Sequence, residues 1–159
     1  MKPIASTAEV LAFRVLNRFT SEVWINWAYD MLVIGFETEH LLILAGIEEP
    51  LDYFEMRKIT NKVFCELNLD YADNDKVIAE YASYLANEGL TGKMEPVIVL
   101  DKLKDIYIEL EYYRPLQHFY MLYFAKEDLK TSEDQWYVTG LDRSNIDQAI
   151  NDYFKEWVS

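Results

Sequence analysis

The stretch from residue 21 to residue 46, SEVWINWAYDMLVIGFETEHLLILAG, constrains the fold more than any other part of this chain. Its apolar side chains recur at helical spacing, so they share one broad face when successive residues turn by about 100°. That face consists of Trp24, Trp27, Ala28, Met31 and Leu32, whereas Glu22, Asn26, Tyr29 and Asp30 fall opposite it. The pattern predicts an amphipathic helix of about four turns.

Two residues further along predict how this helix ends and how the next one begins. Gly35 can adopt the positive φ that commonly follows a helix end, and Thr38 is placed to cap a shorter helix that reaches Gly46. We therefore expect a helical hairpin. Trp24 and Trp27 are expected to be core residues, because aromatic side chains at helical spacing bury large areas; the alternative is that an exposed tryptophan binds a partner.

The rest of the chain repeats the helical pattern. Ser6 and Glu9 have the spacing of a capping box, so a first helix is expected from there to the neighbourhood of Thr20. Further apolar stripes begin near Asp52, Asp73, Pro96, Pro115 and Ser144. With 5 Gly, 4 Pro and no linker in 159 residues, the sequence predicts a single domain over residues 1–159, mainly α, built as an irregular helical bundle of about seven helices.

Two segments leave a β alternative open. Between residues 105 and 113, Ile106, Ile108 and Leu110 alternate with polar or tyrosine side chains, which fits a strand as well as a helix. The helix is preferred because the charges upstream have helical period. Residues 135–140, QWYVTG, favour extended structure, and we expect an apolar segment there that crosses the bundle. The alternative fold is α+β, with a small sheet from about residue 105 to residue 140.

Composition restricts the kinds of partner. The chain has 28 Asp and Glu against 15 Lys and Arg, a formal net charge of −13, whereas nucleic acids and anionic membranes bind basic surfaces. We therefore expect no nucleic-acid partner and no membrane partner, while a basic protein fits. No apolar run approaches the roughly 18 residues of a membrane span, and the amino terminus lacks signal-peptide features, which predicts a cytoplasmic location. The single cysteine, Cys65, is expected to be an inert buried thiol.

The acidic residues are unevenly distributed. From Phe19 to Met56 there is no Lys or Arg, which has two explanations: a solubilising surface or a docking surface for a cationic partner. The docking interpretation predicts one partner-binding surface made of Glu37, Glu39, Glu48, Glu49, Asp52 and Glu55, with Tyr53 as its aromatic anchor. Replacing Glu48, Glu49 and Asp52 with Lys should then slow association and leave stability nearly unchanged.

Motifs for catalysis or metal binding are incomplete. Glu37 and His40 have the Glu-x-x-His spacing of carboxylate-bridged di-iron bundles, but the second pair is missing, because His118 has Pro115 three residues before it. The acidic run over residues 70–75 lacks the Gly and the terminal Glu of a calcium loop, and neither a phosphate-binding loop nor a Gly-x-Ser-x-Gly motif occurs. The sequence therefore predicts no catalytic residues, no cofactor and no metal site.

One run of residues resembles a known pattern. Residues 27–46, WAYDMLVIGFETEHLLILAG, contain Trp-Ala, a Leu, Gly, Thr, two Leu and Leu-Ala-Gly, and they resemble small, uncharacterised bacterial helical proteins, some of which are similar to immunity proteins of toxin systems. Residues 135–157 are similar in character to the ends of such proteins. The resemblance implies binding and neutralising a partner protein without catalysis, for instance a basic nuclease.

The leading prediction is therefore a non-catalytic, cytoplasmic protein-interaction module, immunity-like, that binds a basic toxin through an acidic surface. Two alternatives stay open at the level of the residues. One is an enzyme of unknown class with a site between helices, and the other is an oligomeric structural subunit.

Overall fold

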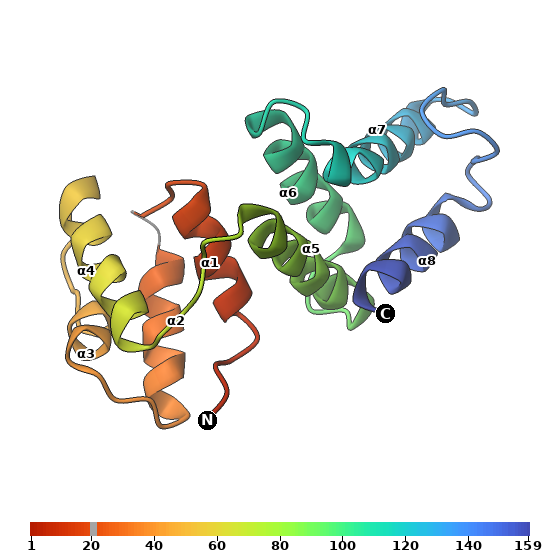
Figure 1. Cartoon of the computed structure of the whole chain (residues 1–159). Coiled ribbons are helices and arrows are strands. Elements are labelled where there is room, and N and C mark those ends of the chain that lie inside the picture. Colours follow the sequence, from red (N-terminus) through yellow and green to blue (C-terminus); the bar gives the residue numbers. More distant parts are fainter. Residues whose placement is uncertain (20–21) are drawn as a thin grey trace. The chain divides into compact units, whose positions relative to one another are not determined.

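The computed structural model describes residues 1–19 and 22–159, and in this part of the chain every regular element is helical (Figure 1). The elements are α1 (Thr7–Val15), α2 (Glu22–Val33), α3 (Glu39–Ala45), α4 (Tyr53–Glu66), α5 (Asn74–Leu90), α6 (Pro96–Glu109), the short 3-10 helix η1 (Arg114–Leu116), α7 (Gln117–Thr131) and α8 (Ile146–Val158). The predicted mainly α fold is confirmed, and the described residues contain no strand of the alternative sheet. The first helix was expected to reach the neighbourhood of Thr20 behind a capping box at Ser6, but it ends at Val15 and Ser6 makes no side-chain capping bond. Thr20 and Ser21 themselves lie outside the described residues.

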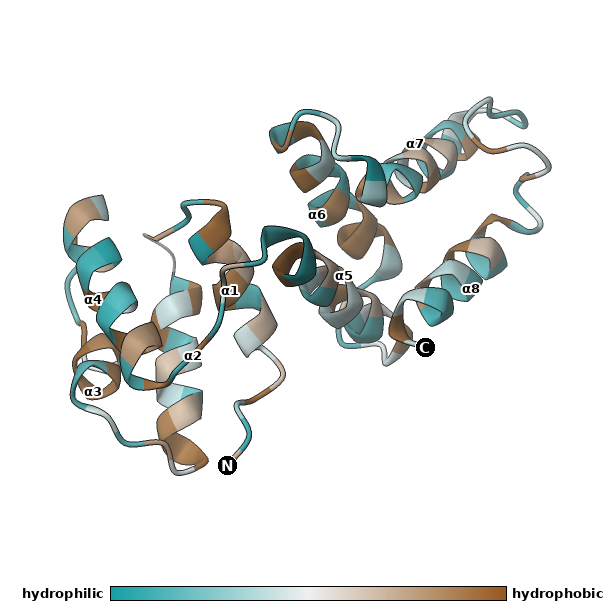
Figure 2. Cartoon of the chain, viewed as in Figure 1, coloured by the Kyte–Doolittle hydropathy of each residue, from teal (hydrophilic) through white to brown (hydrophobic). Residues whose placement is uncertain are grey.

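The chain forms two compact units, Met1–Tyr81 and Ala82–Ser159, which we name the N-terminal unit and the C-terminal unit. The boundary falls within α5, so this helix begins in one unit and ends in the other. In both units hydrophobic and hydrophilic residues occur on the same helix, as α4 and α8 show (Figure 2). Each of these helices can therefore turn one face to a core and another to solvent. The single domain over residues 1–159 stays a prediction.

The core of the N-terminal unit is built around the two tryptophans of α2. Both side chains are buried, and the ring of Phe64 from α4 lies 5.5 Å from Trp24 and 6.2 Å from Trp27 between centroids. The indole N–H of Trp27 donates to Thr7 Oγ1 at 2.9 Å, and that of Trp24 donates to Arg18 O at 2.6 Å. Their prediction as core residues is confirmed, since each buries its ring and satisfies its polar atom.

The α2–α3 hairpin forms around Gly35, whose φ is +111°. Its N–H donates to Leu32 O at 3.0 Å. The N–H of Phe36 donates to Met31 O at 3.1 Å, so the pair of bonds closes α2 in a Schellman arrangement. Thr38 occupies the expected N-cap position of α3, but its side chain makes no capping hydrogen bond.

In the C-terminal unit, residues 105–113 form the end of α6 and the turn after it. Ile106 is buried and Ile108 is exposed, which a helix explains because side chains two residues apart point in different directions. On a strand the two would share a face, so the strand alternative is wrong here. Glu111 and Tyr112 follow with φ of +57° and +65°, and there the helical backbone stops.

Gly89 lies in the last turn of α5, which runs to Leu90 instead of stopping at the glycine as expected. A Cβ at this position would lie 2.7 Å from Cε2 of Phe154 and 3.3 Å from Cγ2 of Val99. Real side chains do not approach so closely without displacement, so the missing side chain lets the ring of Phe154 in α8 pack directly on α5.

Two predictions about individual positions are wrong. Cys65 is exposed, because the buried face of α4 passes through Val63 and Phe64 and turns the next residue to solvent. Residues 135–140 form neither helix nor strand, and Trp136 is 90% exposed instead of belonging to an apolar crossing.

Candidate functional site

All seven residues predicted to bind a partner lie in the N-terminal unit, around α3, α4 and the segment that joins them. The six carboxylates are exposed, and Tyr53 is partly buried. The structure divides them between the two ends of α4. Asp52 caps the first turn of this helix, whereas Glu66, its last residue, contacts His40 at the start of α3. Because the 14 residues of α4 rise by about 1.5 Å each, these ends are about 20 Å apart.

At one end of α4, Glu66 binds the first turn of α3. Its Oε1 accepts the backbone N–H of His40 at 3.0 Å, and its Oε2 lies 2.7 Å from His40 Nδ1. These hydrogen bonds hold the pKa of Glu66 below its usual value. A carboxylate from another helix thus satisfies an amide that Thr38 leaves unbonded. Glu39 stands beside this pair, and Glu37 precedes it in the chain.

The same end of α4 is also where the described residues come nearest to a metal-ligand set. One ligand atom each from Glu39, His40 and Glu66 lies within 4.8 Å of the others. Each oxygen of Glu66 already makes one bond to His40, through the backbone N–H and Nδ1. Sequence spacing had paired His40 with Glu37; its actual partner is 26 residues away, beyond the reach of any local motif.

The other histidine, His118, lies in the C-terminal unit. Its ring centroid is 4.4 Å from that of Tyr153, and burial lowers the pKa of His118. His118 therefore belongs to the aromatic packing between α7 and α8. The two histidines lie in unrelated environments, since His40 contacts the carboxylate of Glu66.

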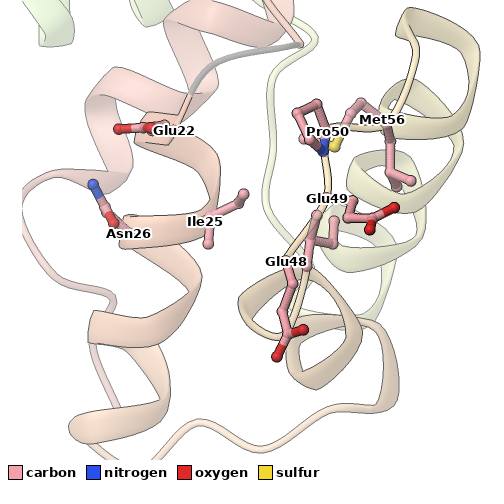
Figure 3. A pocket seen from close by; sticks show the side chains of 9 residues that line it. Glu22, Ile25, Asn26, Glu48, Glu49, Pro50 and Met56 are labelled. Atoms are coloured by element: carbon pink, nitrogen blue, oxygen red, sulfur yellow. The ribbon is translucent and has the colours of Figure 1, made fainter.

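At the other end of α4 lies a hollow of about 410 Å³ (Figure 3). Its floor is apolar and consists of Ile25, Ile47, Pro50, Leu51 and Met56; we call this set the apolar floor. Three carboxylates line it as well, those of Glu22, Glu48 and Glu49; we call them the acidic rim. Figure 3 shows Ile25 pointing from α2 toward the facing segment, while the three carboxylates point away from one another. They line the hollow and do not meet inside it.

The acidic rim combines two predicted residues with one from α2. Glu48 and Glu49 were expected to act together and do line one hollow. Glu22 was identified only as part of the polar face of α2. Asn26 is also part of the lining, and none of the described residues that line the hollow is Lys or Arg. The arrangement therefore combines acidic and apolar side chains in one hollow.

Asp52 and Tyr53 have structural roles. Asp52 Oδ1 accepts the N–H of Glu55 at 2.9 Å and so caps α4. The ring of Tyr53 packs edge-on against Phe19 at 5.3 Å, and its hydroxyl donates to Asn17 Oδ1 at 3.3 Å. The predicted aromatic anchor therefore contributes to the packing of its own unit.

Phe54 is the exposed ring that sequence reasoning missed at this end of α4. Its side chain is 76% exposed. Helical spacing contained the signal, because Phe54 falls in phase with the charged outer stripe at Arg57, Lys58 and Lys62 and not with buried Met56.

Comparisons with protein-family models, with curated proteins and with solved structures find no match to this chain. Within the described residues, no helix combines the length and the hydrophobicity needed to cross a membrane.

Proposed function

We propose that this protein is a non-catalytic interaction module that binds a basic protein partner through the acidic rim and the apolar floor. The observation that carries the proposal is the hollow itself: three acidic residues line it together with apolar side chains, and none of the described lining residues is Lys or Arg. In the surrounding chain, residues 20–55 also contain no Lys or Arg. The negative potential of the rim therefore has no basic neighbour in sequence to neutralise it.

The chemistry of the hollow suits the side chains of lysine and arginine. Both have an apolar stem and a cationic end, so the stem can lie on Ile25 and Met56 while the charge stays at the rim. The diverging carboxylates of Glu22, Glu48 and Glu49 suit several cationic residues on one partner surface better than a single deeply buried cation. Long-range attraction would then raise the rate at which a basic partner associates.

The resemblance of residues 27–46 to immunity-like proteins supports a more specific form of the proposal. The partner would be a basic toxin, for example a nuclease, that this protein neutralises by covering it. Those residues form most of the α2–α3 hairpin. The residues that line the hollow flank them in the chain, with Ile25 and Asn26 just before and Glu48 just after.

The experiment is isolation of the partner with the full chain as bait, followed by affinity measurements with two charge-reversed proteins. One carries Glu48→Lys and Glu49→Lys at the rim. The matched control carries Asp152→Lys and Glu156→Lys on exposed positions of α8, so it has the same net charge. The proposal expects the rim variant to bind at least about tenfold more weakly than the control. Equal affinities of the two variants would indicate that the acidic rim only makes the protein more soluble and does not bind the partner.

The two competing functional classes have separate readouts. Mass spectrometry of the protein from its native host would reveal a bound metal or metabolite if it were an enzyme. Light scattering would show a single larger species if it were an oligomeric structural subunit, whereas an interaction module of this kind is expected to be a monomer before it meets its partner.

A further inference from the structure

The loop of residues 132–145, between α7 and α8, exposes a tryptophan that the proposed function does not use. We call this segment the Trp136 loop. At 90%, Trp136 is more exposed than any other large hydrophobic side chain among the described residues. A large aromatic ring left in water is unusual, because burying such a ring is among the largest gains available to a folding chain.

Gln135 fixes the backbone around this ring. Its side chain is buried, and its Oε1 accepts the N–H groups of Tyr137 at 2.8 Å and Val138 at 2.9 Å. Its Nε2 donates to the carbonyl oxygens of Val138 and Leu141, the latter at 3.0 Å. One amide thus organises the turn from inside, and the residue after Gln135 is directed outward.

The residue after Trp136 is anchored too. The ring of Tyr137 stacks on Phe124 of α7 with centroids 5.6 Å apart and planes 28° apart. With both of its neighbours held, Trp136 is presented on an ordered segment. Binding to it would therefore cost less ordering entropy than binding to a mobile loop.

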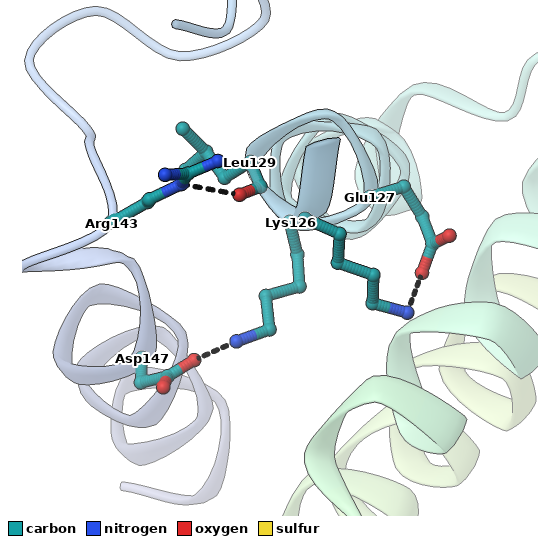
Figure 4. A network of polar contacts seen from close by, with 6 residues as sticks. Lys126, Glu127, Leu129, Arg143 and Asp147 are labelled. Carbon is teal, nitrogen blue, oxygen red and sulfur yellow. Dashed lines mark hydrogen bonds and ion pairs between the residues drawn. The ribbon is translucent and has the colours of Figure 1, made fainter. Parts of the chain in front are cut away.

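The far end of the loop is tied to α7 and α8 (Figure 4). Arg143 Nε donates to Leu129 O at 2.8 Å, and Lys126 Nζ lies 2.6 Å from Asp147 Oδ1 in α8. Figure 4 shows one contact joining α7 to Arg143 near the end of the loop and the other joining α7 to α8. Lys130, just before the loop, pairs with Glu127 at 2.6 Å, so the basic side chains on either side of Trp136 in sequence are already engaged.

The charge around the ring is negative. Residues 131–142 contain Glu133, Asp134 and Asp142 and no Lys or Arg. Glu133 and Asp134, just before the anchored Gln135, are both exposed. An exposed indole face with carboxylates close to it in sequence favours a cation, since the ring quadrupole and the negative charge attract it together.

We propose that the Trp136 loop is a second recognition element, which binds a cationic side chain of a basic polypeptide, arginine foremost, over the Trp136 ring. Arginine fits best because its planar guanidinium stacks on an indole while donating hydrogen bonds to neighbouring carboxylates. This element belongs to the C-terminal unit, whereas the hollow belongs to the N-terminal unit.

Two other occupants fit the loop less well. A second copy of the chain would need an interface of roughly 1,000 Å² or more, and one ring beside the partly exposed Tyr137 offers far less apolar area. An anionic lipid surface would be repelled by the three carboxylates of residues 131–142.

The test uses defined peptides and the full chain at physiological salt. The probe is a short peptide of alternating glycine and arginine, and the control peptide replaces arginine with citrulline, which has nearly the same shape and no charge. The readout is the indole N–H signal of Trp136 in a nitrogen–proton correlation spectrum, assigned by its loss in Trp136→Leu. The arginine peptide is expected to shift this signal, while citrulline leaves it in place.

The same peptides are then titrated against two variants. Trp136→Leu keeps an apolar side chain and removes the aromatic face, and it is expected to bind the arginine peptide about three- to tenfold more weakly. The matched control is Tyr112→Leu. It removes another exposed ring, 69% accessible, which has the basic residue Arg114 close to it in sequence. This variant should bind the arginine peptide as tightly as wild type does.

Three results would overturn the proposal: an unmoved Trp136 signal, an equal shift with citrulline, or unchanged affinity in Trp136→Leu. An equal shift with citrulline would indicate that shape and not charge is recognised, and unchanged affinity in Trp136→Leu would indicate that the aromatic face does not contribute to binding. Repeating the spectrum with the Glu48→Lys, Glu49→Lys protein separates the two sites. The Trp136 shift should persist there, so failure at the rim and failure at the loop can be told apart.

Discussion

The two units place the same residue type in opposite environments. In the N-terminal unit, Trp24 and Trp27 are buried and each indole N–H has a hydrogen-bond acceptor within the unit. In the C-terminal unit, Trp136 is almost wholly exposed. The local backbone explains the difference, because helical spacing turns the first two rings inward whereas Gln135 anchors the loop and directs the third ring outward. The contacts of the neighbouring residues therefore determine whether a tryptophan ring in this chain is buried or exposed.

The units also differ in whether basic side chains lie close to their carboxylates. In the C-terminal unit, Lys104 lies 2.9 Å from Asp101 and 2.8 Å from Asp105, and Lys126 pairs with Asp147. In the N-terminal unit, none of the described residues that line the hollow with the acidic rim is basic. Lysines of the same unit thus partly neutralise carboxylates in the first case, whereas no described lining residue does so in the second.

Trp24→Ala should separate the two kinds of tryptophan most clearly. Removing this buried ring should lower the free energy of unfolding by about 3–5 kcal/mol, since it leaves a cavity and an unbonded carbonyl at Arg18. Trp136→Ala should change it by less than about 0.5 kcal/mol. Urea denaturation followed by circular dichroism measures the free energy of unfolding of both variants. Similar losses of stability would contradict the assignment of one ring to the core and the other to the surface.

Gly89→Ala tests close packing in the C-terminal unit. The new Cβ would meet the Phe154 ring at 2.7 Å, so the free energy of unfolding should fall by about 1–3 kcal/mol. Gly46→Ala is the matched change in the N-terminal unit. There the nearest atom, Leu42 O, is 3.4 Å away and φ is −91°, so thermal denaturation should show no loss of stability.

Asp52→Ala separates structural from docking carboxylates at the α4 end of the hollow. The sequence groups Asp52 with Glu48 and Glu49 as an exposed docking charge, which stays a prediction; the structure shows in addition that Asp52 caps α4. Its replacement should lower the free energy of unfolding by about 1 kcal/mol. Glu49→Ala should change the free energy of unfolding by less than about 0.5 kcal/mol. Equal losses for the two variants in chemical denaturation would contradict the capping role of Asp52.

Glu66→Gln probes the carboxylate that joins α4 to α3. Hydrogen bonds from His40 lower the pKa of Glu66 from 4.5, so the stabilisation is present above about pH 4.5 and is lost as the pH falls through the lower folded-state value. Wild type should therefore be more stable than the variant near pH 7, and the difference in melting temperature should shrink on acidification. A difference that does not depend on pH would exclude the charge as its cause.

Local patterns predicted what depends on local geometry. The buried face of α2, the glycine at its end and the capping role of Asp73, whose Oδ1 accepts the N–H of Lys76 at 3.2 Å, all follow from residues within a few positions of one another. The helix at residues 105–113 was resolved by charge period in the same way.

The remaining features depend on contacts between distant residues. Glu66 and His40 meet across 26 positions, and Glu22 joins Glu48 and Glu49 only because α2 faces the segment before α4. The exposure of Trp136 rests on a glutamine side chain that folds back on the backbone, which no spacing rule reveals.

The most direct test of the acidic rim is the association rate with the isolated partner as a function of salt. At low salt, the protein with Glu48→Lys and Glu49→Lys should associate at least about tenfold more slowly than wild type, because the rim attracts a cationic partner from a distance. The difference should shrink near 0.1 M ionic strength and above, where screening acts over about 10 Å. Unchanged association at low salt would contradict the account and leave the rim without a role in binding.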